Sequence, residues 1–218
     1  RFHALATSAF ERAARIFAHG HEMRQRVIET FPLVTGVEQK IGTLNLGVDT
    51  GVFELIDRDG RAGNIKTLNA SVADRPRGMP AAVVDEQRQR LGADIDRETL
   101  VQLCSDMRGH TTKLPDADIE DKLGRVDWQN DKILLFVGRL ISSKGHQSIV
   151  AALPSILTAH RRARLIITGH GPLRPVMEAF IWALANGAHG LVHNIVAWGS
   201  ALEGGAATPF EEIRLFFK

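Results

Sequence analysis

The chain has 218 residues, which is enough for one large domain or for parts of two. Hydrophobic residues make up 44% of it and charged residues 24%, as is ordinary for a globular protein. The formal net charge of +2 gives no reason to expect a nucleic-acid partner, and no apolar run approaches the length of a membrane span.

Cys104 is the single cysteine, so an internal disulfide is excluded. A reducing compartment, the cytoplasm, is therefore the simpler expectation. The sequence begins at Arg1 rather than at Met and stops abruptly at Lys218, so we expect a piece of a longer protein.

The first 44 residues are predicted to be rich in helix. A helix is expected over 4–12, a short strand over 14–18, and a second helix over 21–31 that Pro32 ends. A further strand is expected over 40–44.

Residues 57–130 are predicted to form a helical insertion. Glycines and prolines in 57–80 indicate an irregular start, and helices are expected over 81–91 and 96–107. Asp116 is the expected N-cap of a third helix, which carries Ile119, Leu123 and Val126 on one face. We interpret the insertion as a variable decoration without chemistry, with binding of an acceptor or a partner as the alternative.

Residues 131–173 have the pattern strand, helix, strand. The continuous apolar run 133–137 predicts a strand that is buried on both faces. The following helix has its apolar stripe at 149, 152, 153, 156 and 157, and Pro154 should bend it or leave a carbonyl without its helical hydrogen bond. A second strand is expected over 165–168. In such a βαβ unit both glycine-containing loops lie at the carboxyl ends of parallel strands, where open α/β sheets bind ligands.

The last part of the chain is predicted to continue this sheet. A helix is expected over 173–186, a third strand over 191–198, a loop over 199–208 and a helix from Pro209 to the end. The expected fold class is therefore α/β, with a doubly wound parallel sheet over 131–218.

Three motifs carry a resemblance to a known family. F-V-G-R-L-x3-K-G at 136–145 and L-I-I-x-G-x-G-P-L-R at 165–174 resemble the donor half of retaining glycosyltransferases with the GT-B fold, the group that includes glycogen synthases and mannosyltransferases. The stretch 44–53, LNLGVDTGVF, is similar to the P-N-G-V-D-x-x-x-F signature at the crossing between the two domains of that family. This chain has Asn45-Leu46 where the family has Pro-Asn. The resemblance covers 41–53 and 132–202, with a weaker match at 12–30.

The resemblance implies a division of the chain. Residues 1–44 would be the end of an N-terminal acceptor domain, 45–56 the hinge, 57–130 the helical insertion, and 131–218 an incomplete Rossmann-like nucleotide-sugar donor domain. We expect the family's loop with two glutamates that have seven residues between them, and most of the acceptor domain, to lie outside these 218 residues. We therefore expect the 218 residues alone to be inactive.

Arg139 and Lys144 are the candidate catalytic and diphosphate-binding residues. Cleavage of a sugar–diphosphate bond builds negative charge on the departing phosphate, which a guanidinium fork and an ammonium group can neutralise. Their spacing alone fits surface charges on an ordinary βα loop equally well. The resemblance assigns both side chains to the diphosphate, with Gly138 and Gly145 beside them.

The remaining site candidates are small residues. By resemblance Gly169 and Gly171 would approach the nucleotide, and Gly199, Ser200 and Ala201 would pack on its base. Turn geometry is the alternative explanation of the glycines.

Two function classes remain open. The first is transfer of a sugar from a nucleotide-diphosphate sugar to an acceptor of unknown nature with retention of configuration, which needs neither metal nor cofactor. The second is a non-catalytic nucleotide-sugar-binding or scaffold module of the same fold. A Rossmann dehydrogenase is a third and poorer option, because GHGPLR lacks the last glycine of G-x-G-x-x-G.

Two clusters of polar residues carry weaker hypotheses. His19 and His21 lack the i, i+4 spacing of a zinc-binding helix, so no metal site is expected there. The basic run 160–164 is interpreted as a solvated helix end. Its alternative is peripheral contact with anionic lipid at the inner face of the membrane.

Overall fold

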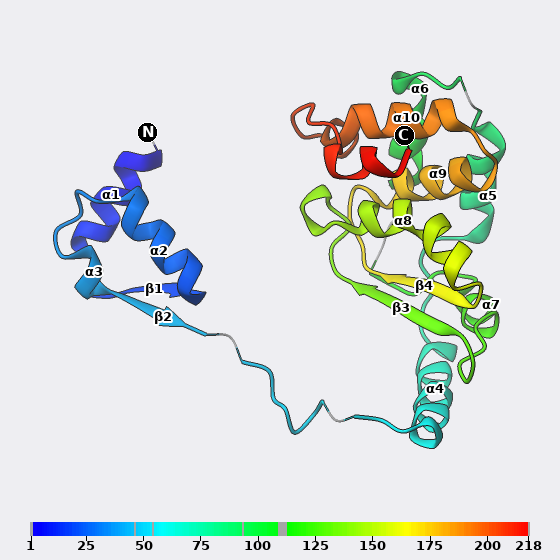
Figure 1. Ribbon diagram of the computed structural model, residues 1–218, viewed down its shortest axis with the longest axis horizontal. Coiled ribbons are helices and arrows are strands. Elements are labelled where there is room, and N and C mark those ends of the chain that lie inside the picture. Colours follow the sequence, from blue (N-terminus) through cyan, green and yellow to red (C-terminus); the bar gives the residue numbers. More distant parts are fainter. Residues whose placement is uncertain (1, 46, 54, 93, 109–112, 218) are drawn as a thin grey trace. The chain divides into compact units, whose positions relative to one another are not determined.

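The computed structural model describes residues 2–45, 47–53, 55–92, 94–108 and 113–217 (Figure 1). The chain divides into two compact units, Arg1–Ile56 and Asp57–Lys218, and each is described by itself. Leu46 of the hinge motif and Lys218 at the end of the last expected helix lie outside the described residues.

The first unit is a small α/β arrangement. Its elements are α1 (Phe2–Arg12), β1 (Ile16–His19), α2 (Gly20–Thr30), α3 (Val37–Lys40) and β2 (Ile41–Leu44). β1 and β2 pair in parallel, from Ile16 opposite Ile41 to His19 opposite Leu44. The helices and strands expected in 1–44 are confirmed.

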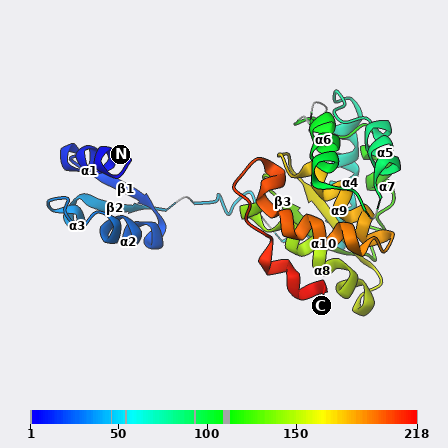
Figure 2. The same cartoon turned by 90° about the horizontal axis from the view of Figure 1, so that it is seen from above.

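One face of the β1–β2 pair is covered. Figures 1 and 2 show α1 and α2 over the same side of the two strands. Ile16 and Ala18 point into a core with Val34, Val37 and Ile41. The alternation along β1 places Phe17 on the opposite face, where it is 67% exposed.

The second unit combines a helical part with one βαβ unit. Its α-helices and strands are α4 (Arg58–Ala73), α5 (Ala81–Arg90), α6 (Arg97–Arg108), α7 (Ile119–Gly124), β3 (Lys132–Val137), α8 (His146–Ala159), β4 (Ala163–Thr168), α9 (Arg174–Ala185) and α10 (His189–Trp198). Three 3-10 helices complete it: η1 (Ser142–Lys144), η2 (Gly199–Glu203) and η3 (Glu211–Phe217). β3 and β4 are parallel with α8 between them, which confirms the predicted βαβ unit and the α/β class.

The third strand predicted over 191–198 is wrong, because this segment is helix α10. Leu191, Val192, Ile195 and Val196 are all buried, at i, i+1, i+4 and i+5. This spacing forms one helical face, whereas a short apolar run by itself fits a strand equally well. Among the described residues the sheet of this unit is therefore the β3–β4 pair.

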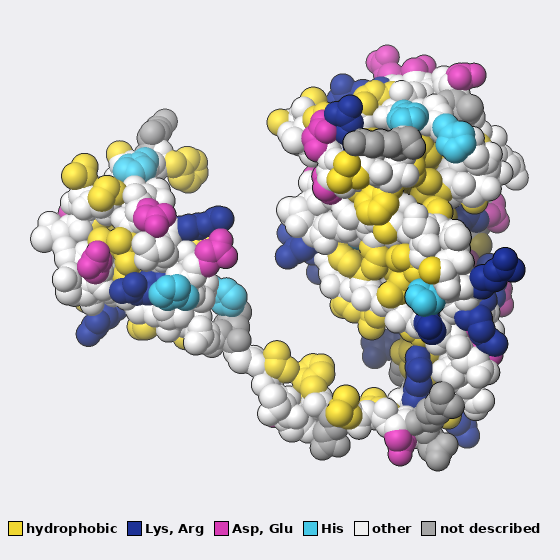
Figure 3. Space-filling model, in the orientation of Figure 1, with side chains coloured by type: hydrophobic (Ala, Val, Ile, Leu, Met, Phe, Trp, Pro, Cys, Tyr) yellow, Lys and Arg dark blue, Asp and Glu magenta, His cyan; other side chains and the backbone are white. Residues whose placement is uncertain are grey.

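β3 is not buried on both faces, in contrast to the prediction. Leu135 is 62% and Val137 70% exposed, because the helices that pack on the pair leave this face uncovered within the described part of the chain. The stripe predicted for α8 is also only half-buried. Val150 and Ala151 form its buried face instead, and Figure 3 shows hydrophobic side chains at the surface over α8.

The insertion is more regular than predicted. Residues 58–73, expected to be irregular, form α4, whose N-cap Asp57 accepts a hydrogen bond from the Gly60 N–H at 2.7 Å. The helices predicted over 81–91 and 96–107 are confirmed as α5 and α6. The expected N-cap Asp116 is wrong, because α7 begins after Asp118.

The insertion and the βαβ unit share one hydrophobic core. Leu100, Leu103 and Cys104 of α6 pack in the same cluster as Val176 and Phe180 of α9. The helices of 57–130 are therefore part of the fold that carries the glycine loops.

The carboxylate of Asp116 ties the insertion to α9. It accepts hydrogen bonds from Arg174 Nη2 at 2.9 Å and from Lys122 Nζ at 2.7 Å. Burial of the carboxyl raises the pKa of Asp116, but the hydrogen bonds and charges of Arg174 and Lys122 outweigh this effect and hold that pKa below its usual range.

We expect Asp116→Asn to lower the free energy of unfolding by roughly 1–3 kcal/mol at pH 7. The ion pairs of Asp116 are partly buried, so their contribution should lie between that of a surface ion pair and that of a buried one. The folded-state pKa is depressed, so this stability is complete above the unfolded pKa of about 4 and is lost as pH falls through the folded pKa. Urea unfolding at pH 7 and at pH 3 should show a larger difference between the variant and the wild type at the higher pH. As a control, Asp85→Asn removes a carboxylate that pairs with Arg88 at the surface, and a loss equal to that of Asp116→Asn would contradict this account.

Candidate functional site

Two loops meet at the carboxyl ends of β3 and β4. The first loop is 138–145 and the second loop is 169–173. The Gly138 N–H donates to Thr168 O at 3.0 Å, and the Leu140 N–H to His170 O at 2.9 Å. Leu140 in turn accepts from the Leu173 N–H at 3.1 Å. The structure thus places the two predicted loops side by side, backbone against backbone.

The glycines of the second loop make this contact sterically feasible. A Cβ on Gly169 would lie 1.8 Å from the carbonyl oxygen of Gly138. A Cβ on Gly171, whose φ is +157°, would lie 2.4 Å from the carbonyl oxygen of Leu140. Close packing of the loops therefore explains why these positions are glycine, and contact with a nucleotide stays a prediction.

The first loop ends in a tight turn into α8. Gly145 has φ +73° and is the N-cap residue of α8. This left-handed conformation disfavours residues with a Cβ, and the space around Gly145 is otherwise open. Gly145 thus fixes where the 3-10 turn η1, which contains Lys144, gives way to α8.

Arg139 and Lys144 are both exposed on the first loop. Within the part of the chain that the structure describes, neither side chain forms a hydrogen bond or an ion pair. Other arginines of this unit, such as Arg162 and Arg174, do pair with carboxylates. The two cations are therefore available to an anionic ligand.

Residues 199–201 lie in η2 after helix α10, and not after a strand as predicted. Gly199 has φ +52°, and a Cβ there would lie 1.9 Å from Thr208 O. The Ser200 N–H also donates to Thr208 O at 2.9 Å, so 199–208 closes on itself. Packing on a base by Gly199, Ser200 and Ala201 stays a prediction.

The structure connects η2 to the first loop through residues that sequence reasoning missed. Glu203 and Glu211 have seven residues between them, so the expectation that such a pair lies outside this chain is wrong. Glu203 accepts a hydrogen bond from the Ser142 N–H at 3.1 Å and another from the Ser142 hydroxyl. Gln147, which is 2% exposed, donates from Nε2 to Ser142 O and to Glu212 Oε1. Contacts over 61 and 65 residues of sequence leave no local pattern that could have revealed them.

His146 lies directly behind the first loop and is fully buried. Its ring is 5.5 Å from that of Phe136, and neither ring nitrogen has a hydrogen-bond partner among the described residues. Burial lowers the pKa of His146, and the charge of Glu203 opposes this only in part. The ring therefore packs as a neutral group under the loop.

Cys104 offers no nucleophile. Its thiol is buried in the core of the second unit, and this burial raises its pKa to about 12. A thiol in such surroundings is inert, because the thiolate is the reactive form.

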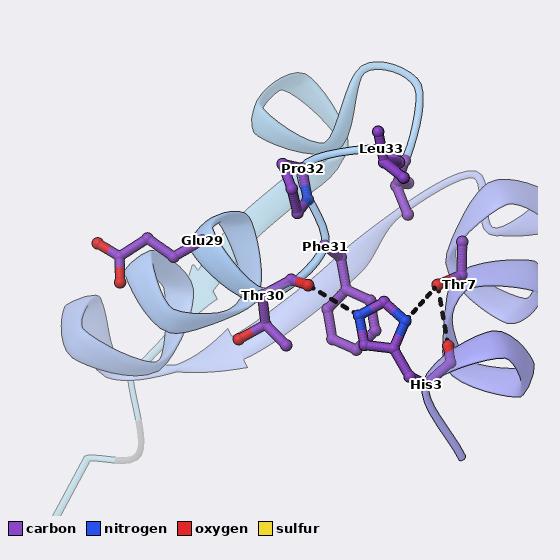
Figure 4. A pocket seen from close by; sticks show the side chains of 8 residues that line it. His3, Thr7, Glu29, Thr30, Phe31, Pro32 and Leu33 are labelled. Carbon is purple, nitrogen blue, oxygen red and sulfur yellow. Dashed lines mark hydrogen bonds between the residues drawn. The ribbon is translucent and has the colours of Figure 1, made fainter. Parts of the chain in front are cut away.

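A pocket of about 220 Å³ lies in the first unit, between α1 and the end of α2 (Figure 4). His3 crosses it, with its Nε2 3.0 Å from Thr30 O and its ring stacked on Phe31 at 4.7 Å. The lining contains none of the predicted site residues.

The basic run 160–164 is largely neutralised. Arg162 and Arg164 both reach Asp131, at 3.4 and 3.0 Å, and Arg162 also pairs with Asp127. Burial raises the pKa of Asp131, but the Asp127 N–H and the two guanidinium groups hold it below its usual range. These ion pairs give Arg162 and Arg164 a structural role, and they leave less positive charge for contact with an anionic surface.

Neither a metal-binding cluster nor a membrane-spanning helix is found among the described residues. No three His, Cys, Asp or Glu side chains in this part of the chain gather closely enough to hold a metal ion. None of its helices is both long and apolar enough to cross a membrane.

Residues 118–197 match the model of the family Glycosyl transferases group 1. An uncharacterized glycosyltransferase of Methanocaldococcus jannaschii is 37% identical over 70 residues, which are 32% of this chain and 16% of that protein. The alpha-D-kanosaminyltransferase of Streptomyces kanamyceticus is 29% identical over 117 residues, 53% of this chain and 28% of that protein. No solved structure matches significantly. Residues 118–197 are thus similar to the family Glycosyl transferases group 1, and the chain spans less than a third of the length of either relative.

Proposed function

We propose that this chain is part of an enzyme that transfers a sugar from a nucleoside-diphosphate sugar to an acceptor, with retention of configuration. The family match and the two glycosyltransferase relatives support sugar transfer. The observation that carries the donor assignment is the pair Arg139 and Lys144, exposed and unpaired on one loop within the described structure.

The chemistry asked of these cations is neutralisation of the leaving group. As the bond between the anomeric carbon and the diphosphate oxygen stretches, negative charge grows on the diphosphate. Arg139 presents a planar fork to two phosphate oxygens, and Lys144 adds a compact charge from the other end of the loop. The proposal includes no metal and no cofactor.

The other predictions about the donor site are kept as proposals. The diphosphate lies against Gly138 and Gly145, the nucleotide passes Gly169 and Gly171, and the base points toward Gly199, Ser200 and Ala201. The hydrogen bonds that Ser142 donates to Glu203 support this course, because they place η2 beside the first loop.

The division of the chain is also a proposal. Residues 131–218 supply the donor side together with the insertion 57–130, 45–56 is the hinge, and 1–44 belongs to the acceptor side. The shared core of α6 and α9 supports treating the insertion and the donor segment as one folded unit. A cytoplasmic location, with the acceptor reached in solution or at the inner face of a membrane, completes the proposal.

Binding of nucleoside diphosphates tests this function. In calorimetric titrations of the chain with UDP, GDP and ADP, we expect Arg139→Ala and Lys144→Ala each to weaken binding of the preferred diphosphate by roughly 1.5–3 kcal/mol. The corresponding nucleoside, which lacks phosphates, should bind the variants and the wild type alike.

Arg161→Ala is the matched control, because Arg161 is an exposed arginine that lies before β4, at the opposite edge of the strand pair. Unchanged diphosphate affinity in both loop variants would remove the donor assignment. Binding without any transfer or hydrolysis of a nucleotide sugar, in a longer chain that includes the acceptor side, would favour the non-catalytic binding module.

A further inference from the structure

The first turn of α9 continues directly from the second loop. Leu173, the last residue of that loop, is fully buried, and its N–H donates to Leu140 O of the first loop at 3.1 Å. The Arg174 N–H donates to Gly171 O at 3.1 Å. A displacement of this turn would therefore displace the second loop as well.

The helical insertion holds this turn through two side chains. Nη1 and Nη2 of Arg174 donate to the two carboxylate oxygens of Asp116 at 3.3 and 2.9 Å, which is a bidentate ion pair. Gln87 of α5 is 4% exposed and donates from Nε2 to Pro175 O at 3.3 Å. Figures 1 and 2 show α5 beside α9. The insertion thus contacts two consecutive residues of the same turn.

Asp116 is itself held by the backbone on both sides. The Gly78 N–H donates to Pro115 O at 2.7 Å, and the Ala117 N–H donates to Met79 O at 3.0 Å. The segment before α5 therefore pairs with the residues that flank Asp116. Because this backbone is restrained, the carboxylate offers α9 a fixed partner.

Both anchoring side chains lie outside the segment that is similar to the glycosyltransferase family. That segment, 118–197, contains Arg174 but neither Asp116 nor Gln87. The helical insertion therefore supplies contacts that the segment 118–197 does not supply for itself.

We propose that Asp116 and Gln87 are positioning residues, through which the helical insertion holds the second loop in place for the nucleotide. This inference rests on the proposed function, in which the nucleotide passes Gly169 and Gly171. A mobile loop would have to lose its conformational freedom when the ligand binds, and a loop ordered in advance avoids most of that cost. The insertion then contributes to ligand binding without contacting the ligand.

The alternative is that contacts with the first loop are enough to hold the second loop. Loss of the Asp116 carboxylate would then lower stability but leave the affinity for the nucleotide unchanged. Val84→Ala separates the two accounts, because Val84 lies in α5 and is buried with Met79 and Met107, away from the first turn of α9. Its cavity should lower stability by an amount similar to that lost in Asp116→Asn.

The test is calorimetric titration with the preferred diphosphate of UDP, GDP and ADP and with its nucleoside. We expect Asp116→Asn to weaken binding of both ligands about tenfold, the loss that follows from re-ordering one to two residues of the second loop. Val84→Ala should bind both within about twofold of the wild type. Arg139→Ala should weaken the diphosphate alone, so a loss that the nucleoside shares identifies the second loop.

Gln87→Met separates positioning from stability more sharply. Methionine has a similar volume but lacks the donor to Pro175 O, so both ligands should bind about threefold more weakly. Stability should change little, because Gln87 Oε1 is buried without a partner among the described residues and its removal offsets the lost hydrogen bond. Affinities equal to those of the wild type in both Gln87→Met and Asp116→Asn overturn the positioning role.

A double variant tests whether Asp116 acts through Arg174. In an Arg174→Met background, Asp116→Asn should cause no further loss of affinity, since the guanidinium that transmits its effect is gone. A further loss as large as that in the wild-type background contradicts the proposed route through α9.

Hydrogen exchange without ligand gives a readout that does not depend on the nucleotide. In Asp116→Asn, the Leu173 amide should exchange faster relative to the Val192 amide, which donates to Ala188 O at the start of α10. In Val84→Ala the ratio of the two exchange rates should equal that of the wild type. An unchanged ratio in Asp116→Asn contradicts the inference about the loop. Failure of the wild type to bind any of the three diphosphates contradicts the proposed function and the consequence for the ligand, so the two failures are distinguishable.

Discussion

Replacement of Phe180 by alanine is expected to lower the free energy of unfolding of the unit Asp57–Lys218 by about 3–5 kcal/mol. Phe180 lies on α9 with no solvent exposure, and its ring meets that of Phe217 in η3 at 6.1 Å, nearly perpendicular. The shared core brings α6, α9 and α10 together around it. Truncation removes apolar contacts with all of these elements and leaves a cavity that a close-packed core cannot fully refill.

The neighbouring residue provides the control for this substitution. Ile181 follows Phe180 on the same helix but points outward and is 41% exposed, so Ile181→Ala should cost only about 1 kcal/mol. Urea unfolding followed by far-UV circular dichroism measures both changes. Similar losses in the two variants would show that α9 does not form the centre of this core.

The βαβ unit could be predicted from the sequence because its signals are local. The apolar run 133–137 is too short for a helix and ends at Gly138, and β3 forms there. The first loop follows directly, so the exposure of Arg139 and Lys144 at the end of a strand could be predicted as well. The family match at 118–197 covers these same residues.

The errors arise where the deciding contact is distant in the sequence. Leu191 to Val196 could be buried by a strand or by a helix, and packing against α9 selects the helix. Asp116 resembles a helix cap locally, but its carboxylate is directed to Arg174, 58 residues away. Glu203 likewise has its partner Ser142 at a distance of 61 residues. Such pairs depend on tertiary structure, which sequence periodicity does not describe.

From the sequence, Gly169 and Gly145 have the same explanation, which is contact with the ligand or turn geometry. The structure assigns them different roles. Gly169 is needed for the space it leaves between the loops, whereas Gly145 is needed for its backbone conformation. The two roles predict different costs for the same substitution, and this difference can be measured.

We expect Gly169→Ala to lower the free energy of unfolding by about 3 kcal/mol or more, because its Cβ would meet the Gly138 carbonyl oxygen at 1.8 Å and backbone cannot rotate away as a side chain can. Gly145→Ala should cost only about 1–2 kcal/mol, the penalty of a left-handed conformation in open space. Gly124→Ala, in α7 with no atom within 4 Å, should be neutral or stabilise the protein by up to about 1 kcal/mol.

Urea unfolding of the three variants measures the order of their losses in free energy of unfolding. Diphosphate titration adds a second criterion. Gly169→Ala pushes on the backbone of Gly138, next to Arg139, so diphosphate affinity should fall together with stability. Gly124 lies in α7, outside both loops, and its variant should bind as the wild type does. A Gly169→Ala protein as stable as Gly124→Ala would mean that the two loops are not packed backbone against backbone, and the proposed donor site would lose the contact that holds its two loops together.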